Sequence, residues 1–213
     1  MIIVLFGKPG AGKGTQAPLL ASALDIPTLA TGDTLRAAIR AGTPLGLEAK
    51  SFMDRGDLVP DSVILKIAAE ELSKPAYATG VILDGVVRTV PQAEGLAKML
   101  ETLGGGRKVD AVLAFDIDND EIVRRLSTRT VCEKCQTPYT GHAVGDTCEK
   151  CGGKLVRRKD DDPDAVRTRL SVYDEQTAPV LAWYQHAGNN VAVVNAVGSV
   201  ADVTARALKA LGK

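Results

Sequence analysis

The residues that most clearly indicate chemistry form a glycine-rich segment near the start of the chain, residues 7–15, with the sequence GKPGAGKGT. An apolar run, 2–6, precedes it, and a segment with helical character, 16–24, follows. A strand, a glycine-rich loop and a helix are the setting of a phosphate-binding loop, in which backbone N–H groups and a helix N-terminus face one anion. Lys13 can reach the outer phosphates of a nucleotide. The alternative is a glycine-rich turn without a ligand.

The loop departs from the general pattern at one position. A hydroxyl residue usually follows the lysine directly and holds Mg²⁺. Here Gly14 follows Lys13, and Thr15 comes one residue later.

A second group of polar residues follows other apolar runs. The expected strands are 2–6, 27–30, 81–83, 111–116 and 191–195, and the expected helices are 14–24, 34–41, 45–55, 61–72, 91–103, 119–129, 163–187 and 201–211. Continuous apolar strands that alternate with helices favour a parallel sheet covered on both faces, with ligands at the carboxyl ends of the strands. Thr31, Asp33 and Asp84 lie at such ends. Asp84 occupies the place of the acid that holds Mg²⁺ or its waters in phosphate-loop enzymes.

The segment 131–156 interrupts the alternation and contains all four cysteines. Cys132 and Cys135 form one pair with two residues between them, and Cys148 and Cys151 form another. Two such pairs can complete a tetrahedral thiolate site, which leaves no open position and so predicts structural zinc. Two disulfides or four free thiols are the alternatives.

The composition limits the classes of partner. Among 213 residues, 26 Lys and Arg balance 26 Asp and Glu, and 45% of residues are hydrophobic. This balance indicates a globular protein without a nucleic-acid or membrane surface. The apolar start is short and lacks the basic flank of a signal peptide, so we expect a cytoplasmic protein, in which cysteines more often bind metal than form disulfides.

Arginines flank the cysteine segment. Arg125 and Arg129 are four residues apart, which predicts one helical face leading into the segment, and Arg158 lies beyond its other end. A lobe with arginines at both hinges could close over phosphates. Residues 31–36 read as a turn with an N-cap before a helix, where Arg36 either meets a second anion or simply follows a cap made by Asp33.

These motifs resemble those of bacterial adenylate kinases of the long-lid, zinc-containing kind, and the resemblance covers essentially the whole chain. The matching patterns are GxPGAGKGT at 7–15, TGDxLR at 31–36, DGxxRTxPQA at 84–93, RKDD at 158–161 and RxRL at 167–170. In that family a glycine before the threonine is the norm. The resemblance implies a phosphate-loop kinase of class α/β with a five-stranded parallel sheet covered by helices. Its core would be 1–30, 60–127 and 162–213, its helical AMP-binding clamp 31–59, and its zinc-ribbon lid 128–161.

The resemblance also implies the roles of individual residues. The ATP-binding residues would be Gly10, Ala11, Gly12, Lys13, Gly14, Thr15 and Arg125. The AMP-binding residues would be Thr31, Arg36, Asp57, Leu58, Val59, Gly85, Arg88, Gln92, Arg158 and Arg169. The catalytic residues would be Lys13, Asp84, Arg88, Arg129, Arg158 and Arg169. Thr15 would ligate Mg²⁺, and the four cysteines would bind zinc.

The implied reaction is the reversible, Mg²⁺-dependent conversion of ATP and AMP into two ADP by a monomer. Other acceptors (UMP, CMP or GMP) and an impaired nucleotide-binding protein are alternatives, and the balanced charge disfavours a zinc-ribbon nucleic-acid module. The chain departs from the family at Val86 and Val87, where Phe-Pro is usual. The Phe-Pro bond is commonly cis, a form that is costly before any residue other than proline. We therefore expect a trans bond at Val87 and weakened use of AMP.

Overall fold

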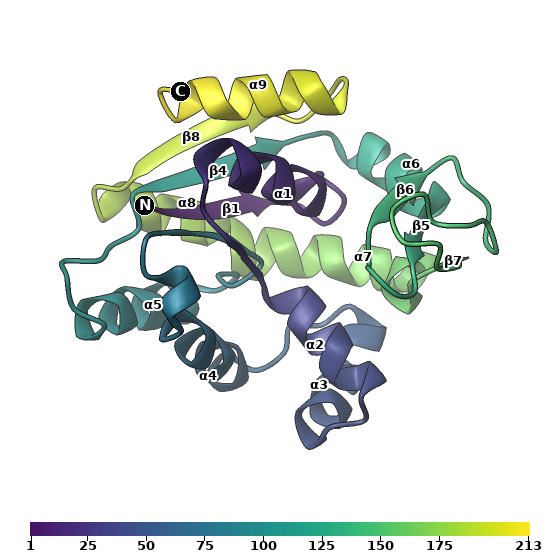
Figure 1. Cartoon of the computed structure of the whole chain (residues 1–213), viewed down its shortest axis with the longest axis horizontal. Helices are drawn as coiled ribbons and strands as arrows, with labels where there is room; N and C mark the ends of the chain where they lie inside the picture. The colour runs from purple at the N-terminus through teal and green to yellow at the C-terminus, as the bar shows by residue number, and fades with distance from the viewer.

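The computed structural model covers residues 1–213 and has a five-stranded parallel sheet at its centre (Figure 1). The strands are β1 (Ile2–Gly7), β2 (Thr28–Ala30), β3 (Val81–Asp84), β4 (Ala111–Asp116) and β8 (Asn190–Asn195). Their order is β2-β3-β1-β4-β8, and every neighbouring pair is parallel. The prediction of an α/β fold built on this sheet is confirmed.

Helices connect the strands. They are α1 (Lys13–Leu24), α2 (Thr31–Arg40), α3 (Pro44–Arg55), α4 (Asp61–Leu72), α5 (Val90–Thr102), α6 (Asn119–Thr128), α7 (Pro163–Val172), α8 (Ala178–His186) and α9 (Val200–Ala210). Short 3₁₀ turns lie at Pro75–Tyr77 and Lys159–Asp161, and a π-helical turn spans Tyr173–Thr177.

Side chains of each central strand alternate between two cores, one on each face of the sheet. Val4 and Phe6 of β1 pack with residues of α4, α5 and α8, whereas Ile3 and Leu5 pack with residues of α1 and α9. Figure 1 shows α9 and α8 on opposite sides of the sheet. Burial on both faces explains why these strands read as continuous apolar runs.

Two smaller lobes extend from this body. Helices α2 and α3 pack with the first turns of α4 around a cluster of Leu35, Ala49, Val59, Ile64 and Ile67. Between α6 and α7 lies an antiparallel sheet of β5 (Arg129–Cys132), β6 (Pro138–Thr140) and β7 (Leu155–Val156), in the order β6-β5-β7. We call these the α2–α3 lobe and the cysteine lobe (Figure 1).

The structure corrects three details of the sequence analysis. Helix α2 begins at Thr31, with Ala30 as its N-cap, so Asp33 lies in the first turn and caps nothing. The Asp33 carboxylate instead accepts a hydrogen bond of 2.6 Å from Arg36.

The second correction concerns Arg129, which begins β5 and shares no helical face with Arg125. Pairing with Thr140 of β6 holds Arg129 in an extended conformation, so tertiary pairing overrides the local helical pattern.

The third correction is that the expected helix 163–187 is divided by the π-helical turn before α8. Pro179 lies in the first turn of α8. Because its ring carries no N–H and would clash with the carbonyl four residues earlier in a regular helix, a wider turn at this place accommodates it.

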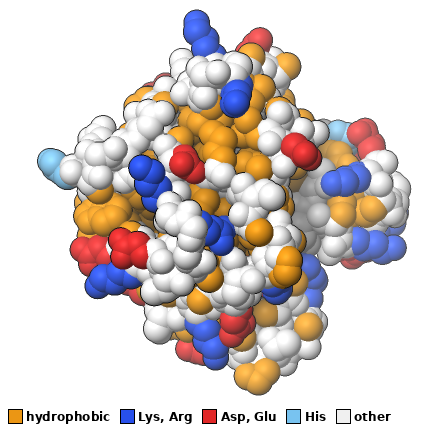
Figure 2. Space-filling view, turned by 60° about the vertical axis from the view of Figure 1, so that its left-hand side comes forward, with side chains coloured by type: hydrophobic (Ala, Val, Ile, Leu, Met, Phe, Trp, Pro, Cys, Tyr) orange, Lys and Arg blue, Asp and Glu red, His pale blue; other side chains and the backbone are white.

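The distribution of charge on the surface agrees with the equal numbers of acidic and basic residues in the sequence. Acidic and basic side chains are mixed over the face seen in Figure 2, without a broad area of one sign. No helix is long and apolar enough to span a membrane.

Candidate active site

The phosphate loop connects β1 to α1 through left-handed glycines. Gly10 has φ of 83° and Gly12 has φ of 96°, conformations that side chains other than glycine adopt only under strain. A Cβ atom at Gly10 would also come within 3.0 Å of Leu126 Cγ. Gly12 is the N-cap of α1 and no side chain caps the helix, so its first N–H groups remain free for an anion.

Lys13 is folded back into this loop. Its Nζ donates hydrogen bonds to the carbonyl oxygens of Gly7 at 2.6 Å and Lys8 at 3.0 Å. Burial lowers its pKa to about 8, against the attraction of Asp84, and the positive charges of Arg88, Arg169 and Arg129 lower it further. A polyanion beside Lys13 would relieve this crowding of positive charge.

A cleft of about 800 Å³ opens in front of the loop. Its wall carries eight cationic side chains and three acidic ones, Asp33, Asp84 and Glu121. The cations are Lys13, Arg36, Arg88, Arg124, Arg125, Arg129, Arg158 and Arg169. Because the protein as a whole is neutral, this excess is local, and it suits a polyphosphate.

Two arginines of the cleft are held by aspartates, and a third is not. Arg129 Nε donates to Asp161 Oδ2 at 2.8 Å, and Nη2 donates to the other oxygen of that fully buried carboxylate. Arg169 Nη1 donates to the carbonyl and the carboxylate of Asp160, at 2.8 and 3.0 Å. Arg158 differs, since its Nε is buried without a partner and so remains available to an anion. Burial lowers the pKa of Arg158 and of Arg169 to about 10, so both stay charged at neutral pH.

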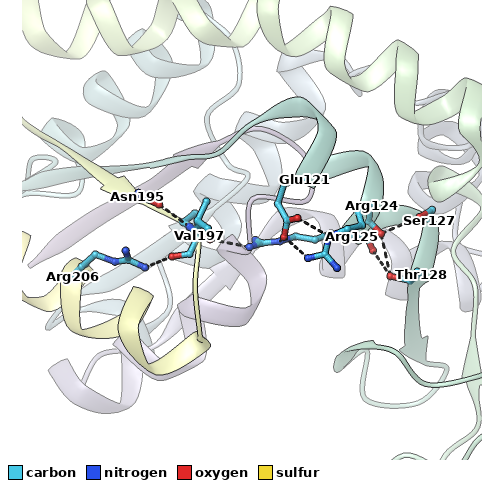
Figure 3. Close-up of polar contacts among 9 residues, drawn as sticks. Glu121, Arg124, Arg125, Ser127, Thr128, Asn195, Val197 and Arg206 are labelled. Carbon is cyan, nitrogen blue, oxygen red and sulfur yellow. Dashed lines mark hydrogen bonds and ion pairs between the residues drawn. The ribbon is translucent and has the colours of Figure 1, made fainter.

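Arg125 joins α6 to the loop after β8 (Figure 3). Its Nε donates to Glu121 Oε1 at 2.8 Å, and its Nη2 donates to the carbonyl oxygen of Ala196 at 3.0 Å. Hydrogen bonds from Arg124 and then Arg125 lower the pKa of Glu121 to about 2, so the carboxylate remains ionised. The guanidinium of Arg125 is thus held against the wall of the cleft.

A second pocket lies between the α2–α3 lobe and the end of β3. Nine of the ten predicted AMP-site residues line it: Thr31, Arg36, Asp57, Leu58, Val59, Gly85, Arg88, Gln92 and Arg169. The tenth, Arg158, lines the larger cleft. Arg36, Arg88 and Arg169 border both spaces. The two candidate nucleotide sites therefore share three cations.

Val86 and Val87 lie in the core beneath this pocket, 1% and 3% exposed, and neither side chain lines it. The backbone contains no cis peptide bond, so the expected trans bond at Val87 is confirmed. Their backbone connects Gly85, whose carbonyl accepts a 2.8 Å hydrogen bond from the Thr31 hydroxyl, to Arg88.

The four cysteines come together in the cysteine lobe. Their Sγ atoms all lie within 4.8 Å of one another, and three of the pairs are 3.4, 3.6 and 3.7 Å apart. Thiolates ~2.3 Å from a tetrahedral zinc lie roughly 3.8 Å from each other. All four cysteines are free, and no disulfide joins them. The donor set and its spacing therefore fit one zinc ion.

Sequence reasoning missed several residues of the cleft. Gln136, Pro138, Tyr139, Thr140 and His142 of the cysteine lobe line it, and Asp160 and Asp161 hold its arginines. Tyr139 also meets the thiol of Cys148, with its Oη 3.2 Å from Sγ. The RKDD pattern was the only sign of the two aspartates. Nothing in the local sequence shows that the cysteine lobe faces the loop.

A phosphate loop that faces a second anion-binding pocket across shared arginines defines the class of nucleoside monophosphate kinases. The family model for adenylate kinase matches residues 5–189. An adenylate kinase of Gemmatimonas aurantiaca is 60% identical over 213 residues, which cover 99% of each chain. Adenylate kinases of Syntrophotalea carbinolica (44% identical, 100% of this chain and 99% of the relative) and Streptomyces griseus (46% identical, 99% and 97%) are also similar. The chain belongs to the adenylate kinase family and is an enzyme of the phosphotransferase class.

Proposed function

We propose that this enzyme catalyses the reversible, Mg²⁺-dependent transfer of a phosphoryl group from ATP to AMP, giving two ADP and so balancing the adenine nucleotides of the cell. The observation that carries the proposal is the position of Arg36, Arg88 and Arg169, which border both the cleft and the second pocket. A donor phosphate in the cleft and an acceptor phosphate in the pocket meet at these cations. Membership of the adenylate kinase family supports AMP over UMP, CMP or GMP.

ATP binds in the cleft. The backbone N–H groups of Gly10, Gly12 and Gly14 and the ammonium of Lys13 hold its phosphates beside Ala11, whose own N–H is donated to the carbonyl of Lys8. Arg125 contacts the adenosine end. Thr15 and Asp84 line the same cleft and supply a hydroxyl and a carboxylate, the hard oxygen donors that Mg²⁺ prefers. Thr15 would hold the ion and Asp84 would act on it through water. Bound Mg²⁺ would neutralise charge on the phosphates.

AMP binds in the second pocket. Thr31, Gly85 and Gln92 meet the nucleoside, Asp57, Leu58 and Val59 line its surroundings, and Arg36 and Arg88 meet its phosphate. Arg129, Arg158, Arg169 and Lys13 stabilise the negative charge of the phosphoryl group as it moves. Phosphoryl transfer needs no covalent intermediate here, because positioning and charge stabilisation account for most of the catalysis in this reaction class.

The chain acts as three parts. Residues 1–30, 60–127 and 162–213 form the core, 31–59 form the clamp that closes on AMP, and 128–161 form the lid that closes on ATP and excludes water. Zinc on the four cysteines holds the lid together. Both nucleotide sites are built from one chain, which supports a monomer, and the mixed surface charge supports a cytoplasmic enzyme without a nucleic-acid or membrane partner.

A coupled assay of ADP formation tests the reaction. With ATP as donor, AMP should be a far better acceptor than UMP, CMP or GMP. Lys13→Ala should lower kcat by orders of magnitude, because it removes a charge from the transferring phosphates. Lys98→Ala, on the exposed side of α5, is the control and should leave the rate unchanged. Near-full activity of Lys13→Ala would contradict the proposal.

A further inference from the structure

The side-chain amide of Gln92 is held at both ends. Its Nε2 donates to Asp61 Oδ1 at 2.7 Å, and its Oε1 accepts the backbone N–H of Arg88 at 2.7 Å. The Thr89 hydroxyl donates to the same oxygen of Asp61 at 3.1 Å and accepts the backbone N–H of Gln92 at 3.2 Å. Gln92 is 1% exposed and lines the second pocket, whereas Asp61 lies behind it at the start of α4.

These two partners allow one orientation of the amide. An ionised carboxylate only accepts hydrogen bonds, and a backbone N–H only donates them. A half-turn of the amide would place its carbonyl against the carboxylate of Asp61 and its NH₂ against the N–H of Arg88. Both contacts would then be repulsive, and a buried polar group without a partner is costly.

The amide keeps one N–H and one carbonyl lone pair unused. Adenine carries an acceptor at N1 beside a donor, its 6-amino group. Hypoxanthine and guanine carry the reverse, a donor N1–H beside a 6-oxo acceptor. In the orientation held by Asp61 and Arg88, a free donor and a free acceptor on one amide complement adenine and oppose the 6-oxo purines.

We infer that Asp61 is a specificity-determining positioning residue, which makes the enzyme prefer the 6-aminopurine monophosphate over 6-oxopurine monophosphates by fixing the amide of Gln92. The inference rests on the proposed AMP site, in which Gln92 meets the base. Asp61 itself touches no substrate and acts only through Gln92.

The test compares AMP with IMP, which has the same ring size but a 6-oxo group. Asp61→Asn has nearly the same shape as the native residue and offers Gln92 a donor as well as an acceptor, so a half-turn of the amide no longer meets repulsion at residue 61 and only the backbone N–H of Arg88 still opposes it. The ratio of kcat/KM for AMP to that for IMP should fall by about tenfold or more, while KM for ATP stays within about twofold. Asp61→Ala removes the acceptor without offering a donor and should lower the ratio by a smaller factor.

Asp164→Asn is the matched control. Asp164 also lies in the first turn of a helix, α7, but its side chain is 94% exposed and lines neither the cleft nor the second pocket. Its substitution removes the same charge from a helix N-terminus and should leave the AMP to IMP ratio unchanged. Thermal melts establish that each variant is folded.

Gln92→Leu distinguishes failure of the role inferred for Asp61 from failure of the proposed AMP site. If Gln92→Leu leaves the kinetics of both AMP and IMP unchanged, the base does not meet Gln92 and the proposed AMP site is wrong. If Gln92→Leu abolishes the preference but folded Asp61→Asn and Asp61→Ala keep the native ratio, only the role of Asp61 is overturned.

Discussion

At the scale of single residues, the decisive feature is a lysine with little negative charge around it. Lys13 is buried among three arginines, with Asp84 as its only acidic neighbour of consequence, and its pKa is lowered to about 8. Bound phosphates would supply the negative charge that offsets these cations. The site is thus prepared for an anion that the protein does not itself supply.

This pKa predicts that ATP affinity falls as pH rises above about 8. Below that pH Lys13 carries its charge, whereas above it the free enzyme loses the proton and must take it up again on binding a polyanion. Calorimetry with a non-hydrolysable ATP analogue from pH 6.5 to 9.5 measures the dissociation constant. At its steepest, the dissociation constant should rise nearly tenfold for each pH unit. Lys13→Met should bind weakly and without this pH dependence; equal slopes in both proteins would contradict the prediction.

Protein stability should change in the opposite sense. The folded pKa of Lys13 lies below its unfolded value of 10.5, so between about pH 8 and 10.5 the unfolded state binds more protons. The contribution of Lys13 to the free energy of unfolding therefore rises with pH in the range where ATP affinity falls. Denaturant melts across this pH range measure the free energy of unfolding. The difference between the wild type and Lys13→Met gives the contribution of Lys13.

Weakened use of AMP because of Val86 and Val87 stays a prediction. The two side chains lie in the core, but their backbone connects Gly85 to Arg88 at the edge of the second pocket. The double variant Val86→Phe with Val87→Pro should raise kcat/KM for AMP and leave KM for ATP unchanged, because small displacements of positioning residues are costly in rate. Equal AMP kinetics before and after would show that the departure from the family is harmless.

At the scale of elements, the α2–α3 lobe meets α7 at Gly56. This residue ends α3 with φ of 85°, and a Cβ atom there would lie 2.6 Å from the carbonyl oxygen of Ala165. Gly42, in the turn between α2 and α3, has φ of 65° and nothing within 4 Å of such an atom. Both glycines have a positive φ, but only a side chain at Gly56 would contact a neighbouring helix.

Gly56→Ala should therefore hinder closure of the lobe, and Gly42→Ala should not. Both carry a similar backbone penalty of about 1 kcal/mol, and the clash at Gly56 adds to it in this arrangement, so the melting temperature should fall further in Gly56→Ala. We expect kcat/KM for AMP to fall about tenfold or more in Gly56→Ala and less than about twofold in Gly42→Ala. Similar AMP kinetics in the two variants would show that the close approach has no functional consequence.

The cysteine lobe gives a second prediction at this scale. The lobe has only Cys132, Cys148 and Leu155 as a buried cluster, with Tyr139 beside them. So small a core needs a further constraint, and one zinc per chain should supply it. Chelation should lower the melting temperature and loosen the lid while the core sheet stays folded. Elemental analysis without stoichiometric metal, together with two disulfides by mass, would overturn this.

At the scale of the whole molecule, the second pocket is too small for its proposed ligand. It holds about 60 Å³, whereas small-molecule sites generally begin near ~300 Å³. The α2–α3 lobe must therefore move outward to admit AMP. Hinge motions of this kind take microseconds to milliseconds and often limit turnover.

We predict that a bisubstrate analogue, two adenosines joined through phosphates, closes the opened lobes again and makes the protein more compact in solution than the nucleotide-free enzyme. The phosphates would draw the parts together, because Arg129 and Arg158 of the lid and Arg36 of the clamp line the same cleft as Arg88 and Arg169 of the core. Small-angle scattering should show a smaller radius of gyration with saturating analogue, and adenosine alone is the control without phosphates. An unchanged radius would count against closure.

The sequence by itself determined the elements whose cause is local. Continuous apolar runs gave the five strands, because both faces of the sheet are buried, and glycine spacing gave the phosphate loop, because few other residues adopt its left-handed turns. The spacing of the cysteines likewise predicted the two pairs of the cysteine cluster, because each pair lies within one turn of chain. These features depend on neighbours in the chain, so they can be read without the fold.

Only the tertiary structure decided how distant residues meet. Arg129 left the helix for a strand because β6, which follows it in the chain, pairs with it. Tyr139 and His142 line the cleft because the cysteine lobe lies across from the loop, and Asp161 holds Arg129 from 32 residues away. Asp61 reads as an ordinary helix start, and only the packing of α4 beside α5 places its carboxylate on Gln92. Such contacts arise from the arrangement of elements, which local sequence patterns do not encode.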